Sequence, residues 1–546
     1  MKRDPFHSWF KRLLLFGLLT ILIVTGLSPL ATAAHASPQV QVSSADAVRF
    51  LEQATFGPTS ALITRVQNSG FKDFLEQEFS ARMSLYPSFP PFPADSSVGC
   101  PAGAPANCFR DNYTHHPLQV HFFTNALHGE DQLRQRVAFA LSQIFVVSGV
   151  EIIQPSSMYL YQNIFVRNAF GNFRRILEEV TLNPTMGRYL DMANNRRQAP
   201  NENYAREVLQ LLSIGQFKLN QDGTLQLDGL GQPIPTYDQN TIINFSKLFT
   251  GWTYPPAPGV RNLALNPEYY IGQMVSSEAN HDRTSKTLLD GFVVPANQKA
   301  ETEIRLGLDN IFNHSNVAPF ICKQLIQHLV TSNPSPAYLG RVSAVFNNNG
   351  SGVRGDLRAV VSAILLDAEA RGDVQTDASY GHLREPVLFI TNILRAFNAT
   401  SDGVLLAERG RDMGQYLFYS PTVFNYYQPT YVVPGTSILG PEFSIQSTSA
   451  AITRANFVNQ MVFRTGGPPA GTVLNLTEMQ NLASSTNALL NELDRVLMHG
   501  AMSSAMRARI ATAIDALPNV TAADRLKRAQ WAIYLVLTSS QYQVER

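Results

Sequence analysis

The sequence predicts an all-α protein with a small β-hairpin and long irregular loops. Apolar residues recur at spacings of three and four over most of the chain, as on one face of a helix. In residues 129–148 they include Leu133, Val137, Leu141 and Ile144. Strand signals are scarce, and the best of them is one short segment. With 546 residues, 45% of them hydrophobic and 16% charged, the chain has enough apolar material for a large core.

The helical periodicity continues along the chain and predicts most of its elements. In chain order, further helices are expected at residues 164–180, 205–214, 240–249, 318–330, 338–346, 357–366, 383–397, 489–498, 504–517 and 523–537. The strand signal lies at residues 217–229, where Asp222-Gly223 is a turn signal between two short alternating runs. We expect a surface hairpin there rather than part of a central sheet.

Residues 37–546 are interpreted as one helical domain, or as two lobes (45–265 and 300–546) that share one core. Residues 83–114 interrupt the helical pattern with six prolines and predict a long inserted loop, of a kind that is usually functional or mobile. Cys100 and Cys108 lie in this loop, and we expect them to form a disulfide in an oxidising compartment.

The first 36 residues predict a secretory signal peptide. An apolar run at residues 13–27 precedes Ala34-His35-Ala36, a small-x-small cleavage site, and is itself preceded by the basic residues Lys2, Arg3, Lys11 and Arg12. Cleavage before Ser37 would release a secreted or periplasmic protein, and the alternative is an uncleaved membrane anchor. No later stretch is long and apolar enough to span, so no stable membrane span is expected after cleavage.

The segment PNENYAREVLQLLSIG, residues 200–215, carries the most informative polar pattern. On a helix Asn203 and Glu207 share one face, while Glu202 and Arg206 are spaced to pair at i, i+4. This pattern is interpreted either as a polar cluster aimed into a cleft or as a buried network that orients helices.

A second candidate site contains His281 and Asp282, followed by Lys286. A histidine beside a carboxylate can act as a general base or a metal ligand, because the acid can fix its tautomer. The alternative is a turn in which Asp282 bonds the backbone. If the two segments meet in one pocket, Glu207, His281 and Asp282 are candidate catalytic residues.

Other residues are candidates for binding a substrate rather than for chemistry. Asn203, Arg206 and Lys286 lie beside the candidate catalytic residues. Arg354 lies in residues 350–355, which match the glycine fingerprint of dinucleotide sites. The fingerprint needs a preceding strand, whereas residues 338–346 predict a helix, so we expect a helix-to-helix connection with Asp356 capping the next helix. Arg354 is either a ligand contact or a partner of a helix end.

The aromatic stretch at residues 416–431 supplies the last candidate binding residues, Tyr426 and Tyr427. Tyrosine rings could line a surface that binds sugar or peptide, with their hydroxyls left for polar contacts. The alternative is that these aromatics pack an irregular loop onto the helices.

Several classes of function are disfavoured by the sequence. The formal net charge is +1 and no long basic block is present, so nucleic acid is not an expected partner. The chain has no Gly-x-Ser-x-Gly nucleophile elbow, phosphate-binding Walker loop or His-Glu-x-x-His pattern. No metal site is predicted, and no cofactor can be named.

Several ordered strings resemble the large bacterial family called domain of unknown function 1800. They include RFLEQATFGPT (49–59), DQLRQRVAFALSQIFVVS (131–148), PNENYAREVLQLLSIG (200–215), ICKQLIQHLVTSNPSPAYLGRV (321–342) and LREPVLFITNILRAF (383–397). The resemblance covers nearly the whole chain after about residue 49. It implies an exported protein whose biochemical role is not established, genetically associated with exported sulfatase-like proteins of another family.

The leading hypothesis is therefore an exported binding or assembly factor. It would act with another exported protein, such as a sulfatase-like protein, or with a polysaccharide or other surface polymer. The alternative is a cell-envelope hydrolase- or lyase-like enzyme that uses the Glu207, His281 and Asp282 cluster.

Overall fold

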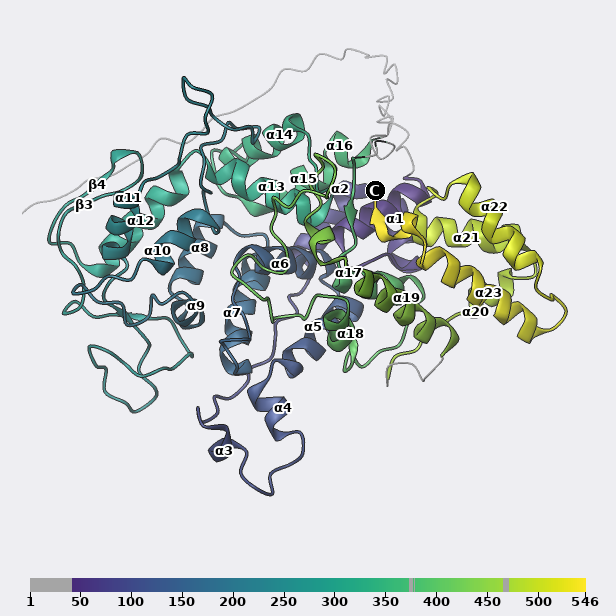
Figure 1. Ribbon diagram of the computed structural model, residues 1–546, viewed down its shortest axis with the longest axis horizontal. Coiled ribbons are helices and arrows are strands. Elements are labelled where there is room, and N and C mark those ends of the chain that lie inside the picture. Colours follow the sequence, from purple (N-terminus) through teal and green to yellow (C-terminus); the bar gives the residue numbers. More distant parts are fainter. Residues whose placement is uncertain (1–41, 373–376, 378, 465–470) are drawn as a thin grey trace, which may run out of the picture. The chain divides into compact units, whose positions relative to one another are not determined.

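The computed structural model describes residues 42–372, 377, 379–464 and 471–546, and it confirms the all-α prediction (Figure 1). Within these residues the strands pair only as short two-stranded antiparallel sheets: β1 (Trp252–Thr253) with β2 (Val275–Ser276), β3 (Lys286–Thr287) with β4 (Val293–Val294), and β5 (His382–Leu383) with β6 (Val544–Glu545). The predicted signal peptide lies outside the described residues. None of the helices in the described ranges is long and apolar enough to cross a membrane.

The N-terminal part of the described chain is a succession of packed helices. α1 begins where the Ser43 side chain accepts a hydrogen bond from the Asp46 backbone N–H, and Gly70, with φ of 77°, kinks α2. α1 packs on α2, and α6 packs on α7. The elements are α1 (Ser44–Ala54), α2 (Ser60–Ser80), α5 (His116–His128), α6 (Gln132–Ile144), α7 (Pro155–Asn168), α8 (Phe173–Thr181), α9 (Pro184–Tyr189) and α10 (Asn203–Gln210).

The single helix predicted at residues 164–180 is wrong, because the chain divides there into α7 and α8. Asn172 caps α8 by accepting a hydrogen bond from the Arg174 backbone N–H, and its own amide donates to the Arg354 carbonyl oxygen at 2.7 Å. The Phe173 N–H donates to the Gly355 carbonyl oxygen at 2.9 Å. A contact between segments far apart in the sequence therefore breaks a helix that local periodicity alone would continue.

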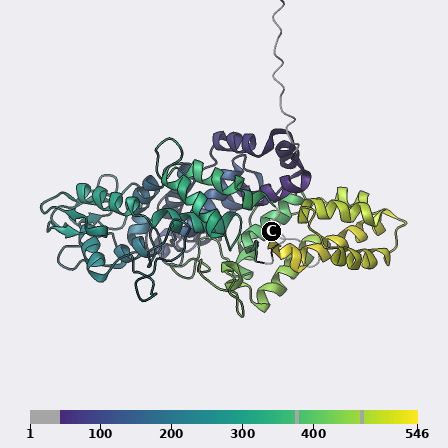
Figure 2. The same cartoon turned by 90° about the horizontal axis from the view of Figure 1, so that it is seen from above.

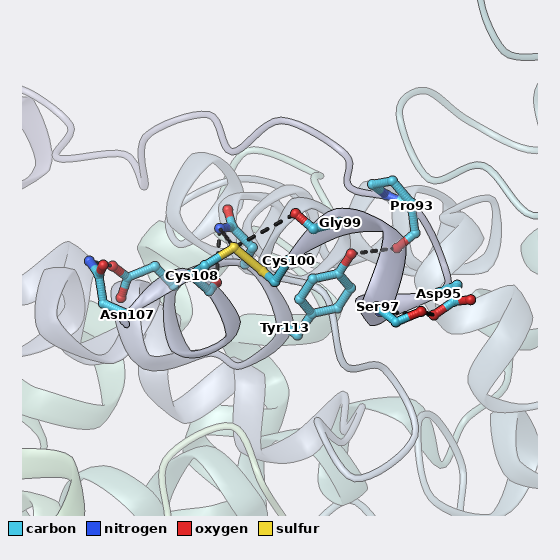
Figure 3. Close-up of a disulfide and its surroundings, with 10 residues drawn as sticks. Pro93, Asp95, Ser97, Gly99, Cys100, Asn107, Cys108 and Tyr113 are labelled. Carbon is cyan, nitrogen blue, oxygen red and sulfur yellow. Dashed lines mark hydrogen bonds between the residues drawn. A yellow bond between two sulfur atoms is a disulfide. The ribbon is translucent and has the colours of Figure 1, made fainter. Parts of the chain in front are cut away.

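The proline-rich segment at residues 83–114 contains two short helices, α3 (Ser96–Gly99) and α4 (Cys108–Tyr113). Cys100 and Cys108 are joined by a disulfide with an S–S distance of 1.96 Å, as expected from the sequence (Figure 3). The Tyr113 hydroxyl donates to the Pro93 carbonyl oxygen at 2.8 Å, and Figure 3 shows this bond beside the disulfide. The Tyr86 N–H donates to Asn163 on α7 at 2.9 Å, which ties the start of the segment to the helices.

The predicted hairpin is present and has a third arm. The Asn220 N–H donates to the Thr224 carbonyl oxygen at 2.8 Å across the turn, where Gly223 has φ of 79°. The Ile234 N–H then donates to the Gln226 carbonyl oxygen at 3.0 Å, which adds the third arm. This segment is followed by α11 (Gln239–Leu248), the strands β1 to β4, the 3₁₀ helix η1 (Leu289–Gly291) and α12 (Ala300–Asn313).

The C-terminal half is again helical and ends at β6. Asp356 accepts hydrogen bonds from the Arg358 and Ala359 backbone N–H groups and caps α15, which confirms the helix-to-helix connection predicted at residues 350–355. Thr521 and Asp524 form a capping box at the start of α23. The elements are α13 (Val317–Leu329), α14 (Pro336–Asn347), α15 (Leu357–Leu366), α16 (Ala368–Arg371), α17 (Pro386–Ala396), α18 (Leu406–Asp412), η3 (Pro441–Ile445), α19 (Thr448–Phe463), α20 (Thr477–Leu482), α21 (Thr486–Met498), α22 (Ser504–Asp515), α23 (Ala522–Leu537) and α24 (Ser540–Gln543).

The buried apolar residues form one connected core, which extends from Ala47 on α1 to Tyr542 on α24. Helices from distant parts of the sequence contribute to it together. α1 packs on α21, α2 packs on α15, and α6 packs on α13. α21, α22 and α23 also pack on one another, and Figure 2 shows these yellow helices lying together. The described residues accordingly form one compact unit, and the division into two lobes stays a prediction.

Candidate ligand-binding pocket

The polar residues predicted on residues 200–215 lie on α10 and around its start. The predicted pair is present, since Arg206 Nη2 lies 2.9 Å from Glu202 Oε2. The Asn203 amide donates to Asp191 Oδ2 at 3.2 Å. Burial raises the pKa of Glu207, whose Oε2 has no hydrogen-bond partner among the described residues. Arg206 and Asn203 on this helix therefore have partners within the protein, whereas Glu207 Oε2 has no hydrogen-bond partner among the described residues.

His281 and Asp282 lie in one cluster with Lys286, in which His281 and Lys286 are buried and Asp282 is partly exposed. His281 Nδ1 lies 2.9 Å from the Thr250 carbonyl oxygen, and His281 Nε2 lies 3.3 Å from Glu303 Oε2, a group that the sequence did not indicate. Lys286 Nζ lies 2.8 Å from the same Glu303 oxygen. The His281, Lys286 and Glu303 side chains are fully buried, so within this cluster only the partly exposed Asp282 reaches solvent. Its arrangement favours a structural role.

Asp282 shows the turn geometry that was the alternative interpretation of this segment. Its Oδ1 accepts hydrogen bonds from the Thr284 N–H at 2.9 Å and from the Thr284 hydroxyl at 2.6 Å. Among the described residues no hydrogen bond or ion pair joins Glu207 to His281 or Asp282. The two segments nevertheless approach each other, because Asn201 and Asn280 line one cleft. A catalytic role for Glu207, His281 and Asp282 stays a prediction.

Arg354 is a partner of a helix end. Its guanidinium donates to the carbonyl oxygens of Phe312 and His314, at 3.0 Å each, and also to Asn347. The first two acceptors lie at the C-terminal end of α12, where carbonyl groups lack helical partners. These contacts connect α12 to α14, and they occupy the Arg354 guanidinium with partners inside the protein.

The two tyrosines predicted to bind a ligand have different surroundings. The Tyr426 hydroxyl donates to the Tyr416 carbonyl oxygen, within the same aromatic stretch. The Tyr427 side chain is buried, and its hydroxyl donates to Glu385 Oε2 at 2.7 Å. The stretch therefore packs onto the helices through its tyrosine hydroxyls, and Tyr427 also forms part of the wall of a cavity.

This cavity opens between α6, α13 and residues 423–429 of the aromatic stretch. The empty space in this cavity and at its mouth totals about 520 Å³. The centre of a water molecule fits in about 50 Å³ of that space. A buried water needs about 10–15 Å³ of such space, so the enclosed part accepts one small group rather than a polymer chain. α6 contributes Gln143, α13 contributes Gln324, Gln327 and His328, and η3 contributes Glu442.

Gln327 has a fixed amide orientation at this cavity. Its Nε2 donates to the Ser332 carbonyl oxygen at 3.1 Å and to the Pro429 carbonyl oxygen at 3.0 Å, which uses both of its N–H groups. Its Oε1 is buried and has no hydrogen-bond partner within the described part of the chain. Leaving a buried acceptor unsatisfied costs about 1–3 kcal/mol, so a donor that reached this oxygen would be stabilised there.

Glu442 is an acid with unusual properties at the same cavity. Burial raises its pKa to about 7, although the neighbouring charge of His382 lowers it in part. Its Oε2 accepts a hydrogen bond from the Ser332 hydroxyl at 3.3 Å, and its Oε1 lies 3.8 Å from His382 Nδ1. His382 Nε2 in turn lies 3.4 Å from Glu545 Oε2 on β6. Perturbed acids of this kind concentrate at functional sites.

Buried polar groups lie behind the wall of the cavity and form hydrogen bonds with its lining residues. Glu385 accepts hydrogen bonds from the Tyr427 hydroxyl and from Gln143 Nε2, at 2.7 Å and 3.2 Å. Arg136 on α6 is fully buried and donates to the His328 carbonyl oxygen. Burial, followed by the charge of Arg136, lowers the pKa of His328 to about 3, so its imidazole is neutral.

Sequence reasoning missed Gln143, Gln327, His328, Glu385 and Glu442. The first four lie in three of the strings that resemble the family, at residues 131–148, 321–342 and 383–397. In the sequence, each of these four is a polar residue within an otherwise apolar helical run, and this was the signal that could have identified it. That signal identifies a buried polar group but not its partners, which come from other segments.

Other clefts in the described chain are more open and have fewer buried polar groups. One is lined by residues 191–201 together with Asn280, and another by parts of residues 497–503 and 540–546. Among the described residues no group of three or more His, Cys, Asp or Glu side chains is arranged to hold a metal ion. The cavity beside Gln327 and Glu442, called the α6/α13 pocket below, is therefore the candidate site.

One comparison with known proteins gives a match. A family model described as a protein of unknown function (DUF1800) matches residues 49–544, which is nearly the whole chain and agrees with the resemblance of the sequence strings. No curated protein and no solved structure matches the chain.

Proposed function

The chain belongs to this family, the DUF1800 proteins of unknown function, and we propose that it is an exported protein that binds a sugar residue of a surface polymer in the α6/α13 pocket. The observation that carries the proposal is the Gln327 amide. Its two N–H groups are committed to backbone carbonyls, and its buried oxygen has no partner among the described residues. A sugar hydroxyl is a donor that such an oxygen accepts.

The remaining lining groups also suit a sugar. Side-chain amides come from Gln143, Gln324 and Asn425, and apolar ring surface comes from Phe320 and Phe424. Ligand sites commonly combine apolar and aromatic walls with a few convergent polar groups that fix orientation. Phe424 is 37% exposed, so its ring is accessible at the surface.

The size of the cavity indicates how a polymer would bind. The enclosed space holds one small group, so a single ring would place one edge in the pocket and leave the rest of the chain in solvent. The proposal thus concerns the end or a side branch of a polysaccharide.

Two observations support action outside the cytoplasm. The Cys100–Cys108 disulfide is typical of an oxidising compartment. The first 36 residues carry the three parts of a secretory signal.

The test is saturation-transfer difference NMR of the mature protein with three disaccharides: cellobiose, N,N′-diacetylchitobiose and chitobiose with free amines. We expect at least one to bind, and Gln324→Met to weaken it by about five- to tenfold, the worth of about one hydrogen bond. Gln67→Met on α2 is the matched control, because Gln67 makes a similar long amide bond, to Val42, away from the pocket. Failure of all three sugars to bind would overturn the proposal and favour a partner protein, such as the sulfatase-like protein, as the ligand.

A second candidate function follows from Glu442. A carboxyl group with pKa about 7 can donate or accept a proton near neutral pH, so the pocket could serve a hydrolase- or lyase-like enzyme. Release of new reducing ends from the bound disaccharide, abolished by Glu442→Gln with binding retained, would establish this alternative. Binding without turnover would leave the protein a binding factor.

A further inference from the structure

The three-armed β segment at residues 216–236 has backbone hydrogen bonds that close in a ring. The Lys218 N–H donates to the Ile234 carbonyl oxygen at 2.8 Å, and the Ile234 N–H donates to the Gln226 carbonyl oxygen at 3.0 Å. The Gln226 N–H completes the ring by donating to the Lys218 carbonyl oxygen at 2.8 Å. Each arm therefore pairs with the other two, and a partner that adds a strand finds no free edge at these residues. Recognition of this segment must use its side chains.

One face of the segment is apolar throughout. Alternate residues of a strand, and residues directly opposite on a neighbouring strand, point to the same face. Six residues meet this description, in the opposed pairs Phe217–Pro235, Leu219–Leu225 and Leu227–Pro233. None of the six belongs to the connected core of the described residues, and four of them are exposed while the other two are half-buried. We call these six residues the β-segment face.

The helical part of the protein lies against the other side of the segment. Lys218 and Ile234, which alternate with residues of the β-segment face, line a cleft together with Asn244 of α11. Lys218 Nζ also lies 3.9 Å from Asp290 Oδ1 on η1. The β-segment face accordingly points outward. Contiguous exposed apolar patches are rare on monomeric proteins, and they mark interaction sites.

Negative charge borders this face at both turns of the segment. Asp222 accepts hydrogen bonds from the Thr224 hydroxyl and N–H, which lower the pKa of its carboxyl group. Asp228, at the second turn, accepts a hydrogen bond from the Leu230 N–H at 2.8 Å. Lys218 is the only cation in residues 216–236, and its partner is Asp290. Asp222 and Asp228 thus have no cationic partner among the residues that the structure describes.

This border favours one kind of occupant over two others. Anionic lipid surfaces attract segments bordered by lysine and arginine, so the acidic border opposes a membrane. A second copy of the chain would bring its own Asp222 and Asp228 against the same acids, which charge complementarity disfavours. A protein surface with the opposite charge at its border satisfies both the apolar face and the two carboxylates.

We infer that the β-segment face is the docking surface for another protein, whose own surface is apolar and bordered by lysine and arginine. The face shares no residue with the lining of the α6/α13 pocket, so this inference goes beyond sugar binding.

The test begins with photo-crosslinking of the full chain in its native cells, with benzoylphenylalanine in place of Leu227. The control carries the same photoreactive residue in place of Val520, which is 83% exposed and lies outside the segment. We expect an adduct with one other protein at position 227 and none at position 520. Mass spectrometry identifies this protein, which is then purified for calorimetric titration against the unsubstituted chain and its variants.

The titrations test the chemistry of the contact. Leu227→Gln should weaken binding at least about tenfold, as expected for an apolar side chain at the centre of an interface. Leu227 is 54% exposed, so this variant should keep Tm within about 1 °C, and a loss of binding is then not a loss of folding. Asp222→Asn with Asp228→Asn should weaken binding about threefold at low salt and reduce its dependence on salt. Val520→Gln should bind like the unsubstituted chain.

Other outcomes would overturn the inference. These are no adduct at position 227, or an adduct with a second copy, with lipid or within the same chain. A partner whose affinity is unchanged by Leu227→Gln would show that the contact lies elsewhere. Affinity that neither salt nor the paired aspartate substitutions alter would remove the basic border from the description of the partner. Sugar binding in the α6/α13 pocket is measured separately, so its success or failure is distinguishable from these results.

Discussion

Replacing Arg384 by methionine should destabilise the protein more than most single substitutions. The Arg384 side chain is 2% exposed and holds two buried carboxylates, Glu52 at 2.7 Å and Glu545 at 3.0 Å. Its Nε also donates to the Tyr542 carbonyl oxygen at 3.0 Å. These partners come from α1, α24 and β6, so one guanidinium connects the two ends of the described chain. Methionine keeps an apolar stem of similar length but leaves both carboxylates without this partner.

The expected magnitude follows from the burial of the pair. Removing one partner of a buried ion pair costs about 3–5 kcal/mol, because the remaining charge is left uncompensated. The entropy of unfolding is about 2.1 cal/mol/K per residue, or about 1 kcal/mol/K for a chain of this length. A loss of about 4 kcal/mol therefore lowers Tm by about 4 °C.

Differential scanning calorimetry of the protein measures this shift. The matched control is Arg411→Met, because Arg411 pairs with Asp412 at 3.3 Å with half of its own side chain exposed. An exposed pair contributes about 0–1 kcal/mol, so the control should change Tm by less than about 1 °C. Equal shifts for the two variants would refute the assignment of Arg384 as a buried connection between the chain ends.

Three further predictions concern other parts of the chain. Glu442 has a folded pKa of about 7 against an ordinary value of 4.5, so the folded state retains a proton that the unfolded chain releases. The free energy of unfolding should thus fall by about 3 kcal/mol as pH rises from 4.5 to 7. Calorimetry of Glu442→Gln should show a smaller fall. A pH dependence that the substitution leaves unchanged would exclude Glu442 as the source of the fall. Replacing Cys100 and Cys108 by serine should remove about 2 kcal/mol of the stabilisation that the disulfide gives to its loop. We expect faster proteolysis at residues 83–114, and an unaltered cleavage rate would contradict this role of the disulfide. Mass spectrometry of the exported protein should find Ser37 at its N-terminus, and an intact leader would indicate the membrane-anchor alternative.

The helices were predictable because their apolar periodicity is a local property. The expectation at residues 357–366 coincides with α15, and those at 318–330 and 523–537 differ from α13 and α23 by single residues at their ends. The split between α7 and α8 was not predictable in this way, since it depends on Asn172 bonding Arg354 in a distant segment. The helix predicted at 383–397 begins at Pro386 for a similar reason, because His382 and Leu383 pair with β6.

The candidate pocket was less accessible to sequence reasoning. The aromatic stretch containing Tyr427 was identified, but its partners Gln143 and Glu385 come from α6 and from the start of α17. Nothing in the local pattern of either segment specifies which buried polar groups meet. The pKa of Glu442 likewise depends on burial by several elements, so it becomes apparent only from the fold.

The most direct test of the account is a crystal structure of the protein soaked with the disaccharide that binds in solution. We predict that one sugar ring lies in the α6/α13 pocket, with a donor within hydrogen-bond distance of Gln327 Oε1 and its face near Phe424. A ring located instead in the cleft beside Asn201 and Asn280, with the α6/α13 pocket containing only water, would contradict the central claim.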